Sequence, residues 1–475
     1  MELVLRSVGP FLHEVERGPG MRVPARVFAD DALLEHIRGD LSLRQLVNVT
    51  TLPGITGAAL GMPDMHQGYG FPVGGVAGTL LPDGVVSPGG IGFDINCGVR
   101  LLVSRMSRDD LGPALEPLVH EISRSIPAGY GRSGRLSLTR QEMDRVLEEG
   151  CPYLLREHGL GHPEDLEYIE SGGALPGADA GQVSERAKQR GEDQLGTLGG
   201  GNHFVEVQVV EAVHDEEAAR RLGLFPGQVA VLIHTGSRGL GHQVCTDQVR
   251  TMDHAARKYG IQLPDRQLAC APLSSPEGRS YFAAMCAAAN FGWCNRQVIA
   301  QRVREAFRRM LPGRPGTELR LVYDVAHNTA KIERHGNRDL CVHRKGATRA
   351  FGPSAADIPK AYRGLGQPVL IPGSMGTASW VLLGTDEAEA LSLASTCHGA
   401  GRAMSRGAAK RMVAGHVLRK ELLARGIVVR CPSNLELAEE APAAYKDVDR
   451  VVDVVHGARL ARKVARLVPI GVVKG

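Results

Sequence analysis

The segment "GGIGFDINCGVRLL", residues 89–102, places two reactive side chains inside an apolar, glycine-rich run. Four of its fourteen residues are glycine, and isoleucine, phenylalanine, valine and leucine give most of the rest the character of a buried strand. Asp94 and Cys97 lie in its middle, three residues apart. Glycine permits tight turns and close approach of the backbone. The segment therefore predicts a sharp turn beside a strand, and it raises the question of why a carboxylate and a thiol lie together there.

Outward from this segment, short apolar runs bounded by glycine recur along the chain. Their length and their content of valine and isoleucine favour strands, at residues 71–81, 84–95, 202–210, 227–239, 319–329 and 366–376. Apolar residues three and four positions apart predict helices, at residues 107–126, 275–311, 406–426 and 447–467. The stretch 275–311 is expected to be one long helix or a broken pair.

Together these patterns predict an α+β fold. We expect residues 1–475 to form a single large domain with central β-sheets. The composition shifts near residue 128 to a polar stretch rich in glycine and glutamate. We therefore expect residues 105–195 to be a peripheral helical insertion within this domain.

The composition excludes several classes of protein. Apolar runs are interrupted before the roughly 20 residues that a membrane span requires, and residues 1–20 lack the apolar stretch of a signal peptide. Nine cysteines without a CxxC pair argue against a disulfide framework or a zinc ribbon. We therefore expect a cytoplasmic protein in a reducing compartment, in which each thiol is either a core residue or a ligand. The net charge of +4 permits an anionic partner without requiring one.

Polar side chains recur where predicted strands end beside glycine. Imidazole is the commonest metal ligand, carboxylate suits hard cations and thiolate suits softer ones, so these residues are candidates for a divalent transition-metal centre. The alternative is that the histidines are hydrogen-bonded structural residues, and spacing alone does not decide between the two. The candidates are Asp94, Cys97, Asn202, His203, Glu206, His234, Ser237, Arg238, His242, Asp324, His327, Asn328, His398, Arg402 and Arg406.

Two further segments are candidates for binding phosphate. The chain lacks a GxxxxGK[ST] loop and a GxGxxG turn between a strand and a helix. However, "IPGSMGTASW" (371–380) and "HGAGR" (398–402) are turns with free backbone N–H groups. Such turns suit phosphate oxygens, although either one can equally be a plain turn.

Nine motifs, taken in order, carry a resemblance to a known family. They are "GGIGFDINCGVRLL", "LGTLGGGNHFVEV", "HTGSRGLGHQV", "AHNTAK", "VHRKGATRAF", "IPGSMGTASWVL", "STCHGAGRAMSR", "AYKDVDRVVD" and "PIGVVKG". The chain resembles the RtcB-type RNA ligases from about residue 62 to residue 475. That family joins RNA ends bearing a 3′-phosphate or a 2′,3′-cyclic phosphate to 5′-hydroxyl ends, using GTP and Mn²⁺. The resemblance implies the same reaction here, in tRNA splicing or RNA repair.

The resemblance also implies a dinuclear metal centre at the middle of the sheets. Two Mn²⁺ ions would share the thiolate of Cys97. One ion would also bind Asp94 and His203, and the other would bind His234 and His327. This would explain the opening segment, because the strand delivers the thiolate and the turn directs Asp94 to the same ion. By affinity order alone, Zn²⁺ would bind more tightly than Mn²⁺.

The resemblance makes His398 the catalytic nucleophile. Its ring nitrogen would attack the α-phosphorus of GTP, leaving a guanylated histidine. GMP would then pass to the RNA 3′-phosphate, and the 5′-hydroxyl would attack this RNA-ppG intermediate. Cys397, directly before the nucleophile, is expected to pack in the core.

The implied GTP contacts come from several motifs. Glu206, Ser379 and Lys474 would select guanine, so we expect the C-terminal end of the chain to lie in the site. Tyr445 can equally be a packing residue. The full set is Asn202, His203, Phe204, Val205, Glu206, His327, Asn328, Pro372, Gly373, Ser374, Met375, Ser379, His398, Gly399, Ala400, Gly401, Arg402, Tyr445 and Lys474.

Four basic residues are candidates for RNA phosphate contacts, because guanidinium and ammonium groups suit phosphate: Arg238, Arg344, Lys345 and Arg349. A solvated basic loop is the alternative for each.

Two alternative functions for this chain stay open. One is a metal-dependent phosphodiesterase or cyclic-phosphate hydrolase that uses the same metal centre, and the other is a non-catalytic RNA-binding protein. An archaease-like activator is compatible with the resemblance, and no membrane partner is expected.

Overall fold

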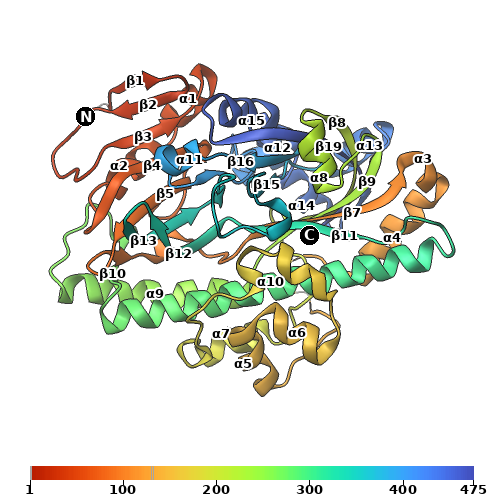
Figure 1. Ribbon diagram of the computed structural model, residues 1–475, viewed down its shortest axis with the longest axis horizontal. Helices are drawn as coiled ribbons and strands as arrows, with labels where there is room; N and C mark the ends of the chain where they lie inside the picture. Colours follow the sequence, from red (N-terminus) through yellow and green to blue (C-terminus); the bar gives the residue numbers. More distant parts are fainter. Residues whose placement is uncertain (1–2, 130, 132) are drawn as a thin grey trace.

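The computed structural model describes residues 3–129, 131 and 133–475, and it contains two large sheets flanked by helices (Figure 1). Among these residues the first sheet has seven strands in the order β1-β2-β3-β4-β5-β13-β12. They are β1 Leu5–Gly9, β2 Leu12–Val15, β3 Ala25–Phe28, β4 Ile55–His66, β5 Val73–Leu80, β12 Asn328–His335 and β13 Arg338–Lys345.

The second sheet has eight strands within the described residues, in the order β11-β7-β9-β8-β19-β16-β15, with β18 parallel to β19. Their bounds are β7 Gly98–Ser107, β8 Phe204–Val213, β9 Gln228–Thr235, β11 Arg320–Ala326, β15 Pro368–Ile371, β16 Ser379–Gly384, β18 Val428–Arg430 and β19 Ala461–Lys474. Two small ribbons pair β6 Val85–Val86 with β10 Ala271–Pro272, and β14 Ala347–Arg349 with β17 Ser395–Cys397. The predicted α+β class is confirmed, with one domain.

The chain passes directly from one sheet to the other at a single residue of the site. β11 of the second sheet ends at Ala326, and β12 of the first sheet begins at Asn328. His327 therefore lies at the junction of the two sheets, where its N–H donates to the carbonyl of Cys97 at 2.9 Å.

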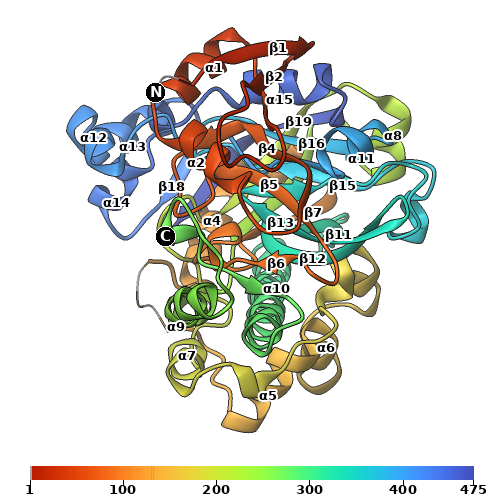
Figure 2. The ribbon, with the colours of Figure 1, turned by 90° about the vertical axis from the view of Figure 1, so that its left-hand side faces the viewer.

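Two long helices, α9 and α10, lie side by side along one face of the molecule (Figures 1 and 2). α10 spans Pro276–Met310 without a break, so the one-helix alternative for residues 275–311 is right. The side chain of Ser275 caps its N-terminus by accepting from the Gly278 N–H. No helix in the described part of the chain is both long and apolar enough to cross a membrane.

The remaining helices are short. Their bounds, with those of α9, are α1 Asp31–Arg38, α2 Ser42–Val49, α3 Arg108–Leu111, α4 Leu115–Ser125, α5 Arg140–Glu149, α6 Cys151–His158, α7 Glu185–Gly191, α8 Glu216–Leu222, α9 Arg238–Lys258, α11 Glu387–Ser392, α12 Arg406–Met412, α13 Gly415–Ala424, α14 Asn434–Glu439 and α15 Val448–Gly457. α5, α6 and α7 belong to the 105–195 region and lie on the side of α9 and α10 away from the sheets (Figure 2).

Four element predictions need correction. The helix predicted at 107–126 is interrupted at Gly112, whose φ is +47°, and Pro113 follows it. The helix predicted at 406–426 divides into α12 and α13 at extended Val413. The strand predicted at 84–95 is only β6 followed by turns. In the helix predicted at 447–467, only the first half is helical, as α15. Residues 461–467 belong to strand β19.

Candidate metal and nucleotide site

Cys97 is the centre of a buried cluster of metal-ligating side chains. Its Sγ lies 3.3 Å from Nε2 of His203 and 3.4 Å from Nε2 of His234. Nε2 of His327 lies 3.3 Å from Nε2 of His234, and Oδ2 of Asp94 lies 3.0 Å from Nε2 of His203. The ligand atoms of Cys97, His203 and His234 are close enough together to hold a metal ion. The structure thus brings together all five side chains that the resemblance implies as ligands.

Strand register explains why residues so far apart in sequence meet. β7 begins at Gly98, one residue after the thiol, and pairs with both β9 and β11. Val99 lies opposite His234 in β9, and Gly98 lies opposite Ala326, one residue before His327. β8 pairs with the other edge of β9, which brings the histidine that precedes β8 to the same end. The cluster therefore forms where neighbouring strands of one sheet begin or end.

Arg296 on α10, which is not among the predicted site residues, holds the backbone that carries these candidate ligands. Its guanidinium donates to O and Oδ1 of Asn96 at 2.8 and 2.9 Å and to O of Thr235 at 2.8 Å. It also pairs with the Asp324 carboxylate at 2.8 Å. A Cβ at Gly98 would lie 2.9 Å from this guanidinium and 2.2 Å from a backbone oxygen of β11, so only glycine fits there.

The charge states around the cluster suit a metal ion. Burial lowers the pKa of His234 and His327 well below the usual histidine value, so both rings are neutral, as metal binding requires. Burial alone would raise the pKa of Asp94, but His203 and Arg238 lower it overall. Burial and the Asp94 carboxylate raise the pKa of the Cys97 thiol, and a bound cation is what would favour its thiolate.

One orphaned atom supports the same interpretation. Oδ1 of Asp94 is buried and has no hydrogen-bond partner among the described residues. Buried polar atoms are normally paired, and a carboxylate oxygen beside a thiol and imidazoles can be satisfied by a cation. One thiol, three imidazoles and one carboxylate therefore fit a divalent transition metal.

His398 follows β17 and lies beside this cluster. The centroid of its ring is 5.0 Å from that of His327. Its Nδ1 lies 2.5 Å from Oδ2 of Asp64, which also accepts from the His398 backbone N–H at 3.1 Å. Because Asp64 occupies Nδ1, Nε2 is the nitrogen left for chemistry. Asp64, on β4, was not among the predicted site residues, although it lies within the "MPDMHQGYGFPVGG" segment in which the resemblance begins.

A cavity opens beside His398. Its lining combines the glycine turn after the histidine with residues from distant segments, and four of them, His66, His234, Arg406 and Glu440, were not among the predicted nucleotide contacts. The lining is His66, Asn202, His234, Pro372, His398, Gly399, Ala400, Gly401, Arg402, Arg406, Glu440 and Tyr445. A Cβ at Gly401 would lie 2.2 Å from the Asp64 carbonyl oxygen, so this turn packs directly against β4.

The residues expected to select guanine form one connected group. Nζ of Lys474 donates to Oδ1 of Asn202 at 3.1 Å, so the C-terminal end of the described chain does lie here. Gln208, which is not among the predicted site residues, donates to Oε2 of Glu206 at 2.7 Å and to Oγ of Ser379 at 3.0 Å. Oε1 of Glu206 has no partner among the described residues. Burial raises the pKa of Glu206 to about 7, although Gln208 and Lys474 oppose the shift.

The other expected GTP contacts are placed as follows. The amide of Asn202 donates to the Gly373 carbonyl at 3.1 Å, which joins the 371–380 turn to the site. The Lys474 ammonium lies 5.6 Å above the Phe204 ring. Asn328 bonds to the Asp94 carbonyl and to the N–H of residue 346. The Ser374 N–H is held inside its own turn by a threonine hydroxyl. Val205 and Met375 point into hydrophobic clusters, so only their backbones are available to a ligand.

The structure speaks against three of the four RNA-phosphate candidates. Arg344 and Arg349 are 1% and 2% exposed, and their guanidinium groups are paired with Glu333 and Asp357. The Lys345 ammonium is buried and donates to the backbone carbonyls of Tyr69, Phe71 and Gly89, at 3.1 Å in the case of Phe71. Burial removes these cations from the surface that RNA would touch.

Arg238, the fourth RNA-phosphate candidate, lies near the cluster around Cys97. Its Nε donates to Oγ1 of Thr197 at 3.0 Å. Ser237 and Cys397 are buried, as packing would require. The ring of His242 stacks on Phe93 with centroids 4.9 Å apart.

Comparison with known proteins shows the family of the chain. The family model described as "tRNA-splicing ligase RtcB" matches residues 45–475. A tRNA-splicing ligase RtcB of Archaeoglobus fulgidus is 52% identical over 482 residues, which cover 100% of both chains. One of Thermococcus kodakarensis is 53% identical over 96% of this chain and 95% of its own. The RNA-splicing ligase RtcB of Mycobacterium tuberculosis is 54% identical over 91% of this chain and 100% of its own. With matches of this extent, the chain belongs to the RtcB family.

Proposed function

We propose that this protein is an RNA ligase that uses GTP and two Mn²⁺ ions to join RNA 3′-phosphate or 2′,3′-cyclic phosphate ends to 5′-hydroxyl ends. The observation that supports this most strongly is the placement of His398. A histidine is held by a carboxylate through Nδ1, beside a buried cluster of metal-ligating side chains and at the wall of a cavity. Relatives named as tRNA-splicing ligases make tRNA halves the first substrate to test.

The chain's own residues account for the first step. Asp64 holds the His398 ring so that Nε2 faces the cavity as the nucleophile. Nε2 attacks the α-phosphorus of GTP, pyrophosphate leaves, and a guanylated histidine remains. The N–H groups of Gly399, Ala400 and Gly401, in the turn after His398, are suited to the phosphate oxygens, whereas those of His398 and Ser374 already donate to other side chains. Asp94, Cys97, His203, His234 and His327 would hold a pair of metal ions. These ions would stabilise the negative charge that develops on the phosphate oxygens.

The later steps follow from leaving-group chemistry. GMP passes from His398 to the RNA 3′-phosphate and forms the RNA-ppG intermediate. The 5′-hydroxyl then attacks the activated phosphate and releases GMP. A hydroxyl cannot displace oxide from a free 3′-phosphate, so this activation is what the covalent histidine provides.

Incubation with α-labelled GTP and Mn²⁺ tests the proposal. We expect an acid-labile labelled adduct on the wild-type protein and on His416→Ala, which changes an exposed histidine of α13. His398→Ala should give no adduct. A protein that forms no adduct but opens cyclic phosphates or cleaves RNA would instead be the hydrolase alternative, and the ligase proposal would then be wrong.

A further inference from the structure

Glu440 is a buried carboxylate in the wall of the nucleotide cavity. It is 1% exposed and follows α14 directly. Oε2 of Glu440 accepts from Nη1 of Arg402 at 3.0 Å and from the Tyr445 hydroxyl. The Arg402 guanidinium also lies 5.0 Å above the Tyr445 ring. Glu440 therefore belongs to a fixed group of three side chains, all of which line the same cavity as His398.

The backbone holds this group beside the nucleophile. Residues 403–444, which include α12–α14, form an excursion of the chain. It begins directly after the 398–402 turn, and its end lies beside that turn. At the base of this excursion the Ala403 N–H donates to the Ala444 carbonyl at 2.8 Å, and the Lys446 N–H donates to the Gly401 carbonyl at 2.9 Å. The position of the carboxylate relative to His398 is thus set by hydrogen bonds at the base and by Arg402.

The second carboxylate oxygen is incomplete. Oε1 of Glu440 is buried and has no hydrogen-bond partner among the described residues. Nε of Arg406 is 3.4 Å away, as an ion pair without hydrogen-bond geometry. Burial would raise the pKa of Glu440, but Lys474, Tyr445, Arg402 and Arg406 lower it overall, so the group is ionised. An ionised carboxylate only accepts hydrogen bonds, and this oxygen therefore needs a donor.

The hydrogen-bond inventory of a ribonucleotide limits what that donor can be. Its phosphate oxygens accept, and its donors are the N–H groups of the base and the two ribose hydroxyls. The proposed function, on which this step rests, assigns the guanine N–H groups to Glu206. That leaves the ribose hydroxyls for Glu440, which shares the cavity with the residue that attacks the α-phosphorus.

We propose that Oε1 of Glu440 accepts a hydrogen bond from a ribose hydroxyl of the bound nucleotide and thereby selects ribonucleotides over deoxyribonucleotides. Arg402 and Tyr445 act as positioning residues, because they hold Oε2 and so aim Oε1. Glu440 becomes a specificity-determining residue of the guanylation step.

The test combines protein variants with nucleotides that lack one hydroxyl. The second-order rate constant of adduct formation is measured for the wild type, Glu440→Ala and Glu440→Gln. Each protein is tested with GTP, 2′-deoxy-GTP and 3′-deoxy-GTP. The matched control is Glu439→Ala, which removes the neighbouring carboxylate that pairs with Lys410. A misfolded variant would lower all three rates together, whereas a lost contact changes their ratio.

The expected result is specific to one hydroxyl. The wild type and Glu439→Ala should use one deoxy analogue about tenfold less well than GTP, or worse, because the hydrogen bond involves a charged acceptor. Glu440→Ala should use that analogue and GTP equally, and Glu440→Gln should fall between. Equal use of all three nucleotides by the wild type, or full discrimination by Glu440→Ala, would overturn the inference. A wild-type protein that forms no adduct with GTP at all would instead refute the proposed function.

Discussion

At the scale of single residues, the orientation of His398 depends on Asp64. The carboxylate contacts both Nδ1 and the backbone N–H of His398, and it is fully buried. A carboxylate in this position fixes the tautomer and stabilises the cation that forms on the ring. Asp64 therefore acts through His398 rather than on the nucleotide.

Asp64→Asn should slow adduct formation by about 100-fold or more, because an amide can present its N–H to Nδ1 and reverse the tautomer. Mn²⁺ affinity should stay within about threefold, since Asp64 is not in the metal cluster. The rate of adduct formation and metal titration measure the two effects, with Asp83→Asn at an exposed position as control. Adduct formation at the wild-type rate would show that Asp64 does not orient the nucleophile.

Glu206 gives the protein a predictable pH dependence. Its pKa in the folded protein is about 7, above the usual 4.5, because it is buried. Between these values the unfolded chain binds fewer protons than the folded one, so stability falls as pH rises through this window. The loss of folding free energy from this one group reaches about 3 kcal/mol above pH 7.

Glu206→Gln should remove this dependence. The free energy of unfolding is measured by urea denaturation at pH 5 and pH 8. The stability of the variant relative to the wild type should be higher at pH 8 than at pH 5. Glu211→Gln, on the same strand but half exposed, is the control and should follow the wild type. Wild-type and Glu206→Gln profiles that run parallel would contradict the assignment of this group.

Among the elements, α10 holds the backbone around the candidate metal ligands through one buried arginine. Arg296 ties the Asn96 turn to the end of β9 and to Asp324 in β11. A second buried arginine of α10, Arg304, pairs with Asp165 at 2.6 Å, in the 105–195 region. The two arginines form a matched pair, since only the first contacts the backbone around the ligands.

Arg296→Met and Arg304→Met should each lower the free energy of unfolding by about 3–5 kcal/mol. Arg304→Met leaves the buried Asp165 carboxylate without its cation. Arg296→Met removes the donor from the Asn96 and Thr235 carbonyls, although Asp324 keeps its ion pair with Arg100. Only Arg296→Met should also weaken metal binding, by about 10–100-fold, as expected for groups that orient metal ligands. Denaturation and metal titration on both variants separate the effects. Equal metal affinity in the two variants would mean that Arg296 has only a structural role.

The element predictions failed where pairing partners lie far away in sequence. The run "ARLARKVARL" (458–467) satisfies a helical pattern, yet most of it is strand because β8 and β16 pair with its two edges. Strand preference depends on such neighbours more than on the local sequence. By contrast, α10 was predictable, because its signal comes from spacing within 35 residues and a serine cap.

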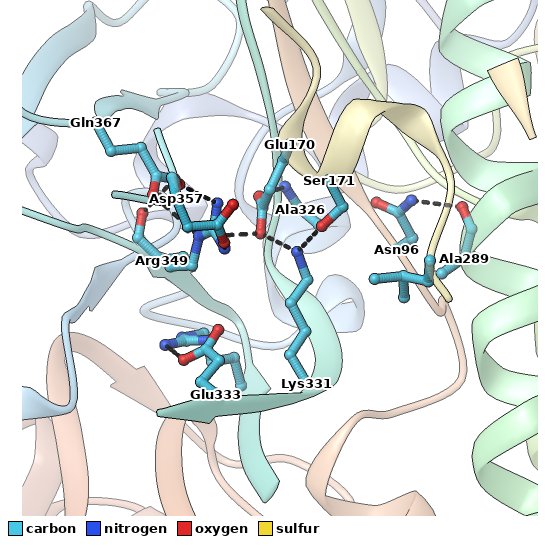
Figure 3. A network of polar contacts seen from close by, with 12 residues as sticks. Asn96, Glu170, Ser171, Ala289, Ala326, Lys331, Glu333, Arg349, Asp357 and Gln367 are labelled. Atoms are coloured by element: carbon cyan, nitrogen blue, oxygen red, sulfur yellow. Dashed lines mark hydrogen bonds and ion pairs between the residues drawn. The ribbon is translucent and has the colours of Figure 1, made fainter. Parts of the chain in front are cut away.

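At the scale of the whole molecule, the 105–195 region reaches the site through Glu170. Figure 3 shows its carboxylate between Lys331 and Arg349, from β12 and β14. Oε1 accepts from Nζ of Lys331 at 2.5 Å, and Oε2 accepts from the Ala326 N–H at 2.8 Å. β11 ends at Ala326, directly before His327, so this region is joined to the backbone next to a candidate metal ligand.

Glu170→Gln should lower the free energy of unfolding by about 3 kcal/mol or more, because two buried cations lose their shared anion. The exposed Glu164→Gln is the control and should stay within about 0.5 kcal/mol of the wild type. Denaturation midpoints measure both. A Glu170→Gln protein as stable as the control would show that the network in Figure 3 contributes nothing net.

The site itself was partly predictable. Thiol and imidazole groups at strand ends stand out by residue type, and the structure brings Cys97 and the three histidines together. Asp64, Gln208, Arg296 and Glu440 lacked such a signal, because buried polar residues on strands and helices look like ordinary ones until their partners are known. Arg344 and Arg349 were misjudged for the same reason, since their carboxylate partners come from other segments.

We propose that five side chains from distant segments, Asp94, Cys97, His203, His234 and His327, together hold a pair of metal ions beside His398. Anomalous diffraction at the manganese edge, from crystals grown with Mn²⁺, tests it most directly. We expect two peaks about 3.5–4 Å apart, both touching Sγ of Cys97, one also touching Asp94 and His203 and the other His234 and His327. A single peak, or peaks that do not touch Cys97, would show that these side chains do not hold a metal pair.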